Sequence, residues 1–92
     1  QNNKEHGIAS YWDQDGNLIN TVEYSYGKIH GDWTRYYKSR NIESIISYKF
    51  DKKDGYKITY YENAIMKSKV LYKDDIEVSD IVRWNKNGVL ID

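Results

Sequence analysis

The feature that most constrains the fold is an internal repeat. Gly31 follows Gly7, and Gly55 follows Gly31, after the same interval of 24 residues. At this interval the aromatic, aliphatic and tyrosine positions also fall into columns. The columns are Gly7, Gly31, Gly55 and Ser79; Trp12, Tyr36, Tyr60 and Trp84; Leu18, Ile42, Met66 and Leu90; and Tyr24, Tyr48 and Tyr72. A fixed period of this length is typical of an array in which each unit is one supersecondary element.

Within each unit, apolar and polar residues alternate with a period of two, as they do in β-strands. Asp15-Gly16 and Asn87-Gly88 share a column between the paired segments and favour hairpin turns. Arg40 and Ala64 occupy this column in the middle units, where we expect another turn geometry or a strained one. The sequence therefore predicts an all-β chain of tandem 24-residue β-hairpin repeats that form one elongated, twisted antiparallel sheet. Seven main strands are expected, centred near residues 10, 21, 34, 45, 58, 69 and 82.

The repeat sets the domain organisation. We expect a single repeat domain over residues 1–92, with units 7–30, 31–54, 55–78 and a partial unit 79–92. Residues 1–6 resemble the tail of a preceding unit. Because both ends fall within a unit, we expect either further repeats of the same chain or edge-to-edge pairing of the outermost strands in a homo-oligomer.

Composition narrows the classes of function. The 14 basic and 14 acidic residues balance, which argues against a nucleic-acid binder that works through bulk positive charge. No apolar run is long enough for a transmembrane helix. The chain has no cysteine, but it has ten tyrosines and three tryptophans. We therefore expect aromatic rings to supply much of the buried area.

No residue set carries a catalytic or metal-binding signature. The segment 13–17 is rich in oxygen ligands, but a calcium loop would need a glutamate at its twelfth position, where Tyr24 stands. His6 and His30 lie one unit apart, which corresponds to roughly 10 Å across two strands and is too far for one shared metal ion. We expect a chain that is not an enzyme and that has no metal and no cofactor.

The alternation also predicts which residues share a face. We expect Trp12, Tyr36 and Tyr60 to lie with Tyr24, Tyr48 and Tyr72 on one mostly buried face. The opposite face would carry exposed aromatic rings with basic residues such as Lys57 between them, a combination that protein interfaces favour. The alternative is that the rings pair across strands and only stiffen the sheet. The candidate partner-binding residues are Tyr11, Trp33, Arg35, Tyr37, Tyr61 and Arg83.

The columns resemble the MORN repeat, and most closely its bacterial tandem variant. The best matches are Gly31-Asp32-Trp33-Thr34-Arg35-Tyr36-Tyr37 and the preceding Tyr24–His30, and the resemblance covers about residues 3–92. It departs at Arg40, Ala64, Asp51, Asp75 and Ser79. The resemblance implies a row of antiparallel hairpins without catalytic residues that acts as a scaffold for protein–protein interaction.

One fold can serve several functions, so two further hypotheses stay open. One is an antitoxin or immunity protein that neutralises a toxin partner. The other is a module that binds carbohydrate or a lipid surface through its aromatic residues. Neither the partner nor the compartment follows from the sequence.

Overall fold

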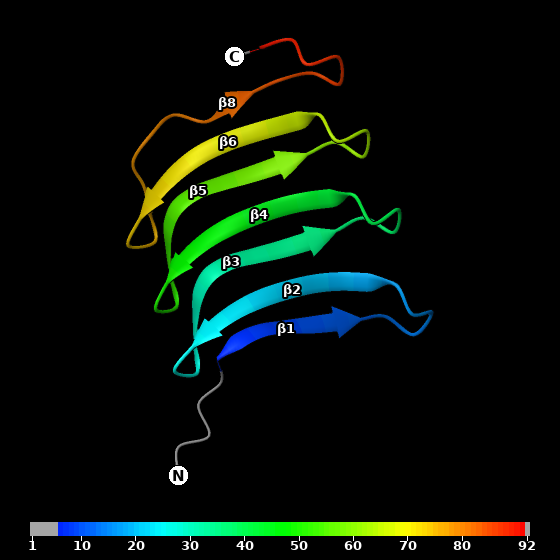
Figure 1. The fold of residues 1–92 in the computed structure, drawn as a ribbon. Helices are drawn as coiled ribbons and strands as arrows, with labels where there is room; N and C mark the ends of the chain where they lie inside the picture. Colours follow the sequence, from blue (N-terminus) through cyan, green and yellow to red (C-terminus); the bar gives the residue numbers. More distant parts are fainter. Residues whose placement is uncertain (1–5, 92) are drawn as a thin grey trace.

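The computed structural model describes residues 6–91, which form one antiparallel sheet without a helix in that part of the chain (Figure 1). The strands follow one another across the sheet in chain order, except that the short β7 and β8 both pair with β6. The predicted all-β fold, its seven strands and its hairpin order are confirmed, and β7 is an additional strand. The strands are β1 (Gly7–Trp12), β2 (Leu18–Ser25), β3 (Lys28–Tyr36), β4 (Ile42–Lys49), β5 (Lys52–Tyr60), β6 (Met66–Lys73), β7 (Ile76–Glu77) and β8 (Val82–Arg83).

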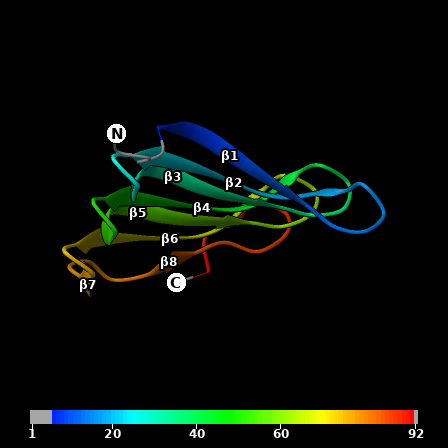
Figure 2. The ribbon, with the colours of Figure 1, turned by 90° about the horizontal axis from the view of Figure 1, so that it is seen from below.

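The molecule is a single twisted layer. Its principal extents are 51 × 36 × 14 Å, and Figure 2 shows the strands rotating steadily from β1 to β8 with nothing stacked on either face. Among the described residues, only Val22 and Val70 are buried, at 2% and 5% exposure. Both faces of the sheet are therefore accessible, and the stabilising contacts are mostly between half-buried side chains of neighbouring strands.

Two kinds of turn alternate along the array. The turns that follow β1, β3, β5 and β8 are alike: in each, one backbone N–H donates to the carbonyl three residues earlier. The donors are Gly16, Arg40, Ala64 and Gly88. All four residues have φ between +73° and +84°. Of the two alternatives expected at Arg40 and Ala64, the strained turn is the one that occurs: both residues adopt the left-handed conformation that glycine adopts in the outer turns. The turns after β2, β4 and β6 have two residues of positive φ each, as in type I′ turns.

The repeat glycines sit where the strands bulge. The register between β2 and β3 shifts between Val22 and Tyr24, opposite Gly31, and the same shift recurs opposite Gly55. Gly31 and Gly55 have φ of +120° and +118°. A Cβ at residue 55 would lie 2.9 Å from the Cβ of Ser47, and one at residue 31 would collide with the Glu23 side chain. These positions need glycine both for backbone conformation and for space.

The expected division of the aromatic columns between the faces is wrong. In the middle of β3 and β4, Cα partners pair an odd with an even residue, as in Trp33↔Ile46 and Gly31↔Tyr48. Tyr48 therefore shares a face with Trp33, whereas Tyr36 lies on the opposite face, where its hydroxyl is 3.4 Å from that of Thr21. The even spacing between Tyr36 and Tyr48 misled the prediction because Tyr36 pairs with Ile42, and the bulge at Glu43 then reverses which parity faces each side. The expected burial also fails, since Trp12 is 54% exposed and the tyrosines of both columns are half-buried.

Hydrogen bonds at both ends of the hairpins tie each unit to the next. At the type I′ turns, the Asp51 N–H donates to the Ile29 carbonyl and the Ile29 N–H donates to the Asp51 carboxylate. Asp75 makes the same two bonds with Lys53. At the other end, the Asn41 amide donates to the Glu62 carbonyl. These bonds fix the relative position of successive hairpins.

Candidate functional site

One side of the sheet, here named the Trp33 face, combines aromatic rings with basic side chains. The cross-strand register defines its members. The Trp33 indole N–H donates to the Asn20 amide oxygen at 3.2 Å, and the ring lies 5.9 Å from that of Tyr48. The side chains of the face are Ala9, Tyr11, Asn20, Val22, Tyr24, Ile29, Trp33, Arg35, Ser44, Ile46, Tyr48, Lys53, Lys57, Thr59, Ser68, Val70, Tyr72, Glu77 and Arg83.

Four of the six predicted partner-binding residues lie on this face. Tyr11 is 45% exposed, and its hydroxyl is 3.2 Å from that of Tyr24. Arg35 stands beside Trp33 on β3, and its guanidinium lies 3.3 Å from the Glu43 carboxylate. Arg83 is exposed on β8, where it pairs with Ser68. Trp33 and Arg35 are thus brought together, whereas Tyr11 and Arg83 stand at opposite ends of the sheet.

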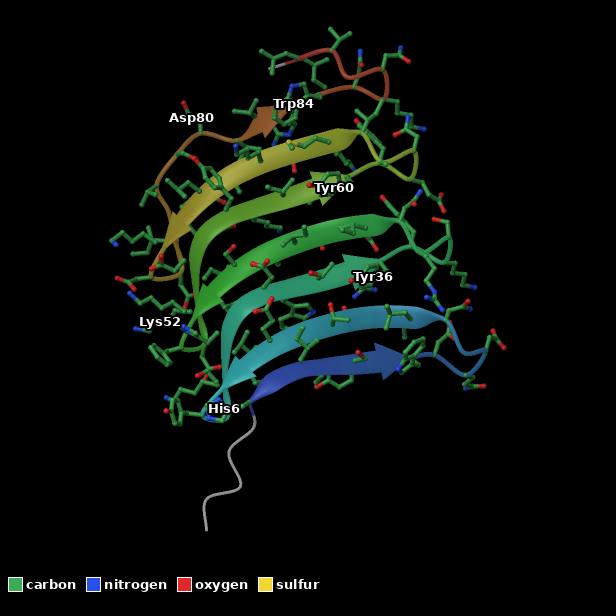
Figure 3. All side chains as sticks on the ribbon, viewed as in Figure 1. His6, Tyr36, Lys52, Tyr60, Asp80 and Trp84 are labelled. Atoms are coloured by element: carbon green, nitrogen blue, oxygen red, sulfur yellow. The ribbon has the colours of Figure 1, made fainter. Side chains whose placement is uncertain are left out.

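The other two predicted residues, Tyr37 and Tyr61, follow the strands and reach toward the next hairpin. The Tyr37 hydroxyl donates to the Tyr60 carbonyl at 2.7 Å, and the Tyr61 hydroxyl donates to the Trp84 carbonyl at 2.9 Å. Figure 3 shows Tyr36, Tyr60 and Trp84 at corresponding ends of successive hairpins, so each bond joins one unit to the following one. Burial raises the pKa of the Tyr37 phenol, and the charges of Glu43 and Glu62 raise it further.

The column containing Tyr37 carries a signal for this role. The equivalent residues in the outer units are Asp13 and Asn85. Each of these accepts hydrogen bonds from backbone N–H groups two and four residues later, within its own turn. The exchange of a turn-capping side chain for tyrosine in the middle units could have indicated that these tyrosines bond elsewhere.

Two adjoining hollows run across the middle of the Trp33 face. One, of about 210 Å³, is lined by Trp33, Arg35, Tyr48 and Lys53, among others. The second, of about 300 Å³, is lined by Tyr37, Glu43, Lys57 and Lys67, among others. They share Ser44 and Ile46 and therefore form one shallow groove from β3 to β6, here named the cationic groove.

The cationic groove is basic because four cations face a single carboxylate. Arg35, Lys53, Lys57 and Lys67 line it, and Glu43 is its acidic residue. Between residues 6 and 91 the only ion pair is that of Arg35 with Glu43. The ammonium groups of Lys53 and Lys67 lie over aromatic rings, at 5.0 Å from Tyr72 and 5.5 Å from Tyr61. Contact with a ring leaves the positive charge of each lysine uncompensated by a carboxylate.

Tyrosines at the rim of the Trp33 face stay protonated over a wide pH range. Burial raises the pKa of Tyr48, and the charge of Asp75 adds to the effect. Burial also raises the pKa of Tyr72, whose hydroxyl donates to the Glu77 carboxylate at 3.2 Å. Both phenols are therefore neutral near pH 7 and can donate hydrogen bonds.

The opposite face has its own hollow, of about 500 Å³, where residues 78–81 leave the sheet. It is lined mainly by Tyr56, Lys69, Leu71, Val82 and Trp84, with Ser79 and Asp80 beside them. The Lys69 ammonium lies 4.3 Å from the centre of the Tyr56 ring. Acidic residues lie on the other half of this face, where Asp32 accepts a hydrogen bond from Ser47.

No metal-binding cluster of three or more histidine, aspartate or glutamate side chains occurs within the described residues. His6 and His30 instead contact aromatic rings of neighbouring turns. Their ring centres lie 4.5 Å from that of Tyr26 and 4.4 Å from that of Phe50. In the same part of the chain, no helix is long and apolar enough to cross a membrane.

Comparison with known proteins found no match: no family model, curated protein or solved structure matches the chain.

Proposed function

We propose that the chain is a non-enzymatic, MORN-type repeat scaffold that binds a protein partner through the Trp33 face. The observation that carries the proposal is that a single-layer sheet presents an aromatic and basic groove over its central strands with no second layer above it. Aromatic rings and arginine are the side chains that supply most binding energy at protein interfaces.

The internal bonding supports a scaffold role. The hairpins are joined by bonds at both of their ends, through Asp51 and Asp75 on one side and Tyr37 and Tyr61 on the other. Such bonds hold the strands in register without engaging the middle of the face. A preorganised surface binds with a smaller entropic cost than a flexible one.

The experiment compares partners captured from extracts of the source organism by the tagged chain and by two variants, with quantitative mass spectrometry. Trp33→Ala removes the ring at the centre of the groove. Tyr56→Ala removes a ring that is 46% exposed on the opposite face and serves as the matched control. We expect a protein that is retained by the unchanged chain and by Tyr56→Ala but is depleted at least tenfold by Trp33→Ala.

Arg35→Glu is a second variant that tests binding without disturbing the fold. The Arg35 guanidinium is exposed, and its removal leaves the Trp33 packing in place. This variant should deplete the same protein. Retention of every captured protein by both Trp33→Ala and Arg35→Glu would contradict the proposal. Binding to glycans or to liposomes that is lost in these variants, without any captured protein, would favour the carbohydrate or lipid hypothesis instead.

A further inference from the structure

We propose that the cationic groove binds an extended acidic segment of the partner protein. The inference rests on the proposed function, because it specifies the chemistry of what the Trp33 face recognises. Its foundation is the local excess of basic side chains that line the groove, in a chain whose net charge is zero.

Charge on the Trp33 face is unbalanced at the level of the strands. On β2–β6, the residues that the register places on this face include Arg35, Lys53 and Lys57 but no aspartate or glutamate. Two carboxylates adjoin these residues and both are engaged: Glu43 by Arg35, and Glu77 on β7 by the Tyr72 hydroxyl. Lys53, Lys57 and Lys67 therefore stay available to an anionic ligand, and a groove in low-dielectric surroundings strengthens that attraction.

The dimensions of the groove suit a short extended peptide. It crosses from β3, which carries Trp33, to β6, which carries Lys67. Four adjacent strands span roughly 14 Å, since neighbouring strands lie about 4.8 Å apart, and an extended chain covers that distance with about four residues. Acidic side chains can then reach the three lysines while an apolar or aromatic side chain contacts Trp33.

The opposite face does not offer the same chemistry. That face also carries lysines, but Lys49, Lys52 and Lys73 lie at strand ends. The basic residue that lines its hollow is Lys69, which lies over Tyr56. Lys69 is therefore a matched control for Lys57: both are lysines in the middle of a strand beside aromatic side chains, but on different faces of the sheet.

The test measures the fluorescence anisotropy of a labelled ten-residue peptide of alternating Glu and Tyr with the full 92-residue chain. A peptide of alternating Gln and Tyr, heparin and a single-stranded oligonucleotide serve as comparison probes. We expect the Glu-Tyr peptide to bind and the Gln-Tyr peptide to bind at least tenfold more weakly. The double variant Lys53→Glu/Lys57→Glu should weaken Glu-Tyr binding by about tenfold or more, whereas Lys69→Glu should leave it within about twofold.

Lys53→Met/Lys57→Met keeps the aliphatic stems and removes only the charges, and circular dichroism of both double variants reports folding. Weakened binding by the folded Met variant would support the proposal. Equal binding of the Glu and Gln peptides, or equal loss with Lys69→Glu, would overturn it. Binding of heparin or the oligonucleotide with the same variant dependence, but not of the peptide, would reassign the groove to another class of polyanion. If the peptide fails while Trp33→Ala still loses the captured protein, the proposed function stands and this inference falls.

Discussion

Residues 76–84 correspond column by column to β3 and β5, yet they do not form one strand. β3 and β5 each run unbroken for nine residues, whereas the equivalent segment divides into the two-residue strands β7 and β8. Figure 1 shows the chain between them leaving the sheet before it returns at β8. The difference coincides with Ser79, which occupies the column of Gly31 and Gly55.

The bulge glycines explain the difference. Their φ of about +120° lies far outside the left-handed well that other residues occupy, and a Cβ there would collide with the preceding strand. Ser79 does not take a positive φ; instead its hydroxyl accepts a hydrogen bond from the Leu71 N–H and donates to the Asp80 carbonyl. A side chain thus replaces part of the backbone pairing that the strand would have made.

The turn column, unlike the strand column, accepts residues other than glycine. The inner hairpins keep the strand glycine but have Arg40 and Ala64 in the turn, whereas the last unit has Gly88 in the turn and Ser79 in the strand. Substitution in the turn leaves the geometry unchanged because φ stays near the left-handed well. Space is also available there, since a Cβ at Gly16 would have no atom within 4 Å. The strand and turn columns both have positive φ, but they therefore differ sharply in how readily they accept a residue other than glycine.

The largest expected effect comes from replacing Gly55 in β5 with serine, the residue that stands at the equivalent position 79. Gly55→Ser should destabilise the chain by about 2–4 kcal/mol, because it combines backbone strain with the clash against Ser47. Urea denaturation followed by tryptophan fluorescence measures the loss. Gly7→Ser is the control: its φ is also positive, but no atom lies within 4 Å of the added Cβ, so it should cost about 1 kcal/mol. Equal losses would show that the clash contributes nothing.

A smaller effect distinguishes the bonds between hairpins. Tyr37→Phe removes the hydrogen bond to the Tyr60 carbonyl on β5, and it should cost about 1 kcal/mol. Tyr61→Phe removes the equivalent bond to the Trp84 carbonyl, beyond the divided strand. We expect less than half the loss there, because the last unit opens more easily. Thermal denaturation of both variants tests this, and a larger loss for Tyr61→Phe would show that the last unit is anchored as firmly as the inner ones.

Ser79→Gly should restore a continuous strand over residues 76–84. Glycine can take the bulge conformation, so amides within residues 79–81 should become protected from hydrogen exchange and stability should rise by up to about 1 kcal/mol. Ser79→Ala is the matched control, since it removes the bond from the Leu71 N–H without adding backbone freedom, and it should destabilise. Unprotected amides in Ser79→Gly would show that residue 79 does not by itself divide the strand.

In the turns, Ala64→Gly should stabilise the chain by about 0.5–1 kcal/mol, because it relieves a φ of +73°. Gly16→Ala is the reverse change in the equivalent turn, and it should destabilise by a similar amount. Differential scanning calorimetry of the pair is the measurement. Stability changes of the same sign would mean that the two turns are not equivalent.

The sequence predicted the fold well because the strand columns, the repeat glycines and the turns are local signals that recur at one interval. It failed on the faces because alternation does not reveal the β-bulge at Glu43, which puts Tyr36 and Tyr48 on opposite faces. It also placed Tyr37 and Tyr61 among the exposed aromatics, since alternation does not reveal that a side chain after a strand bonds the next hairpin. The cationic groove arises from four strands together, and no single segment of sequence displays it.

The smallest effect concerns pH and the two outer turns. Asp13 accepts bonds from the N–H groups of Asn17 and Asp15, and the bond from Asn17 is the main reason that the pKa of its carboxyl lies below the ordinary value of 3.8. Asn85 makes the equivalent bonds in the last unit without titrating.

Because the folded state lowers this pKa, the contribution of the Asp13 carboxylate to stability is complete above pH 3.8 and is lost as the pH falls through the lower folded value. Asp13→Asn keeps the acceptor and removes the titration. Urea denaturation at pH 7 and at pH 2.5 should therefore show a smaller acid-induced loss in Asp13→Asn than in the unchanged chain. Asp15→Asn, in the same turn, should leave the acid-induced loss closer to that of the unchanged chain. Asp13→Asn and the unchanged chain could instead lose the same stability in acid. In that case the carboxylate at residue 13 would hold the first turn no more strongly than an amide does, and the first turn would resemble the last, which has Asn85.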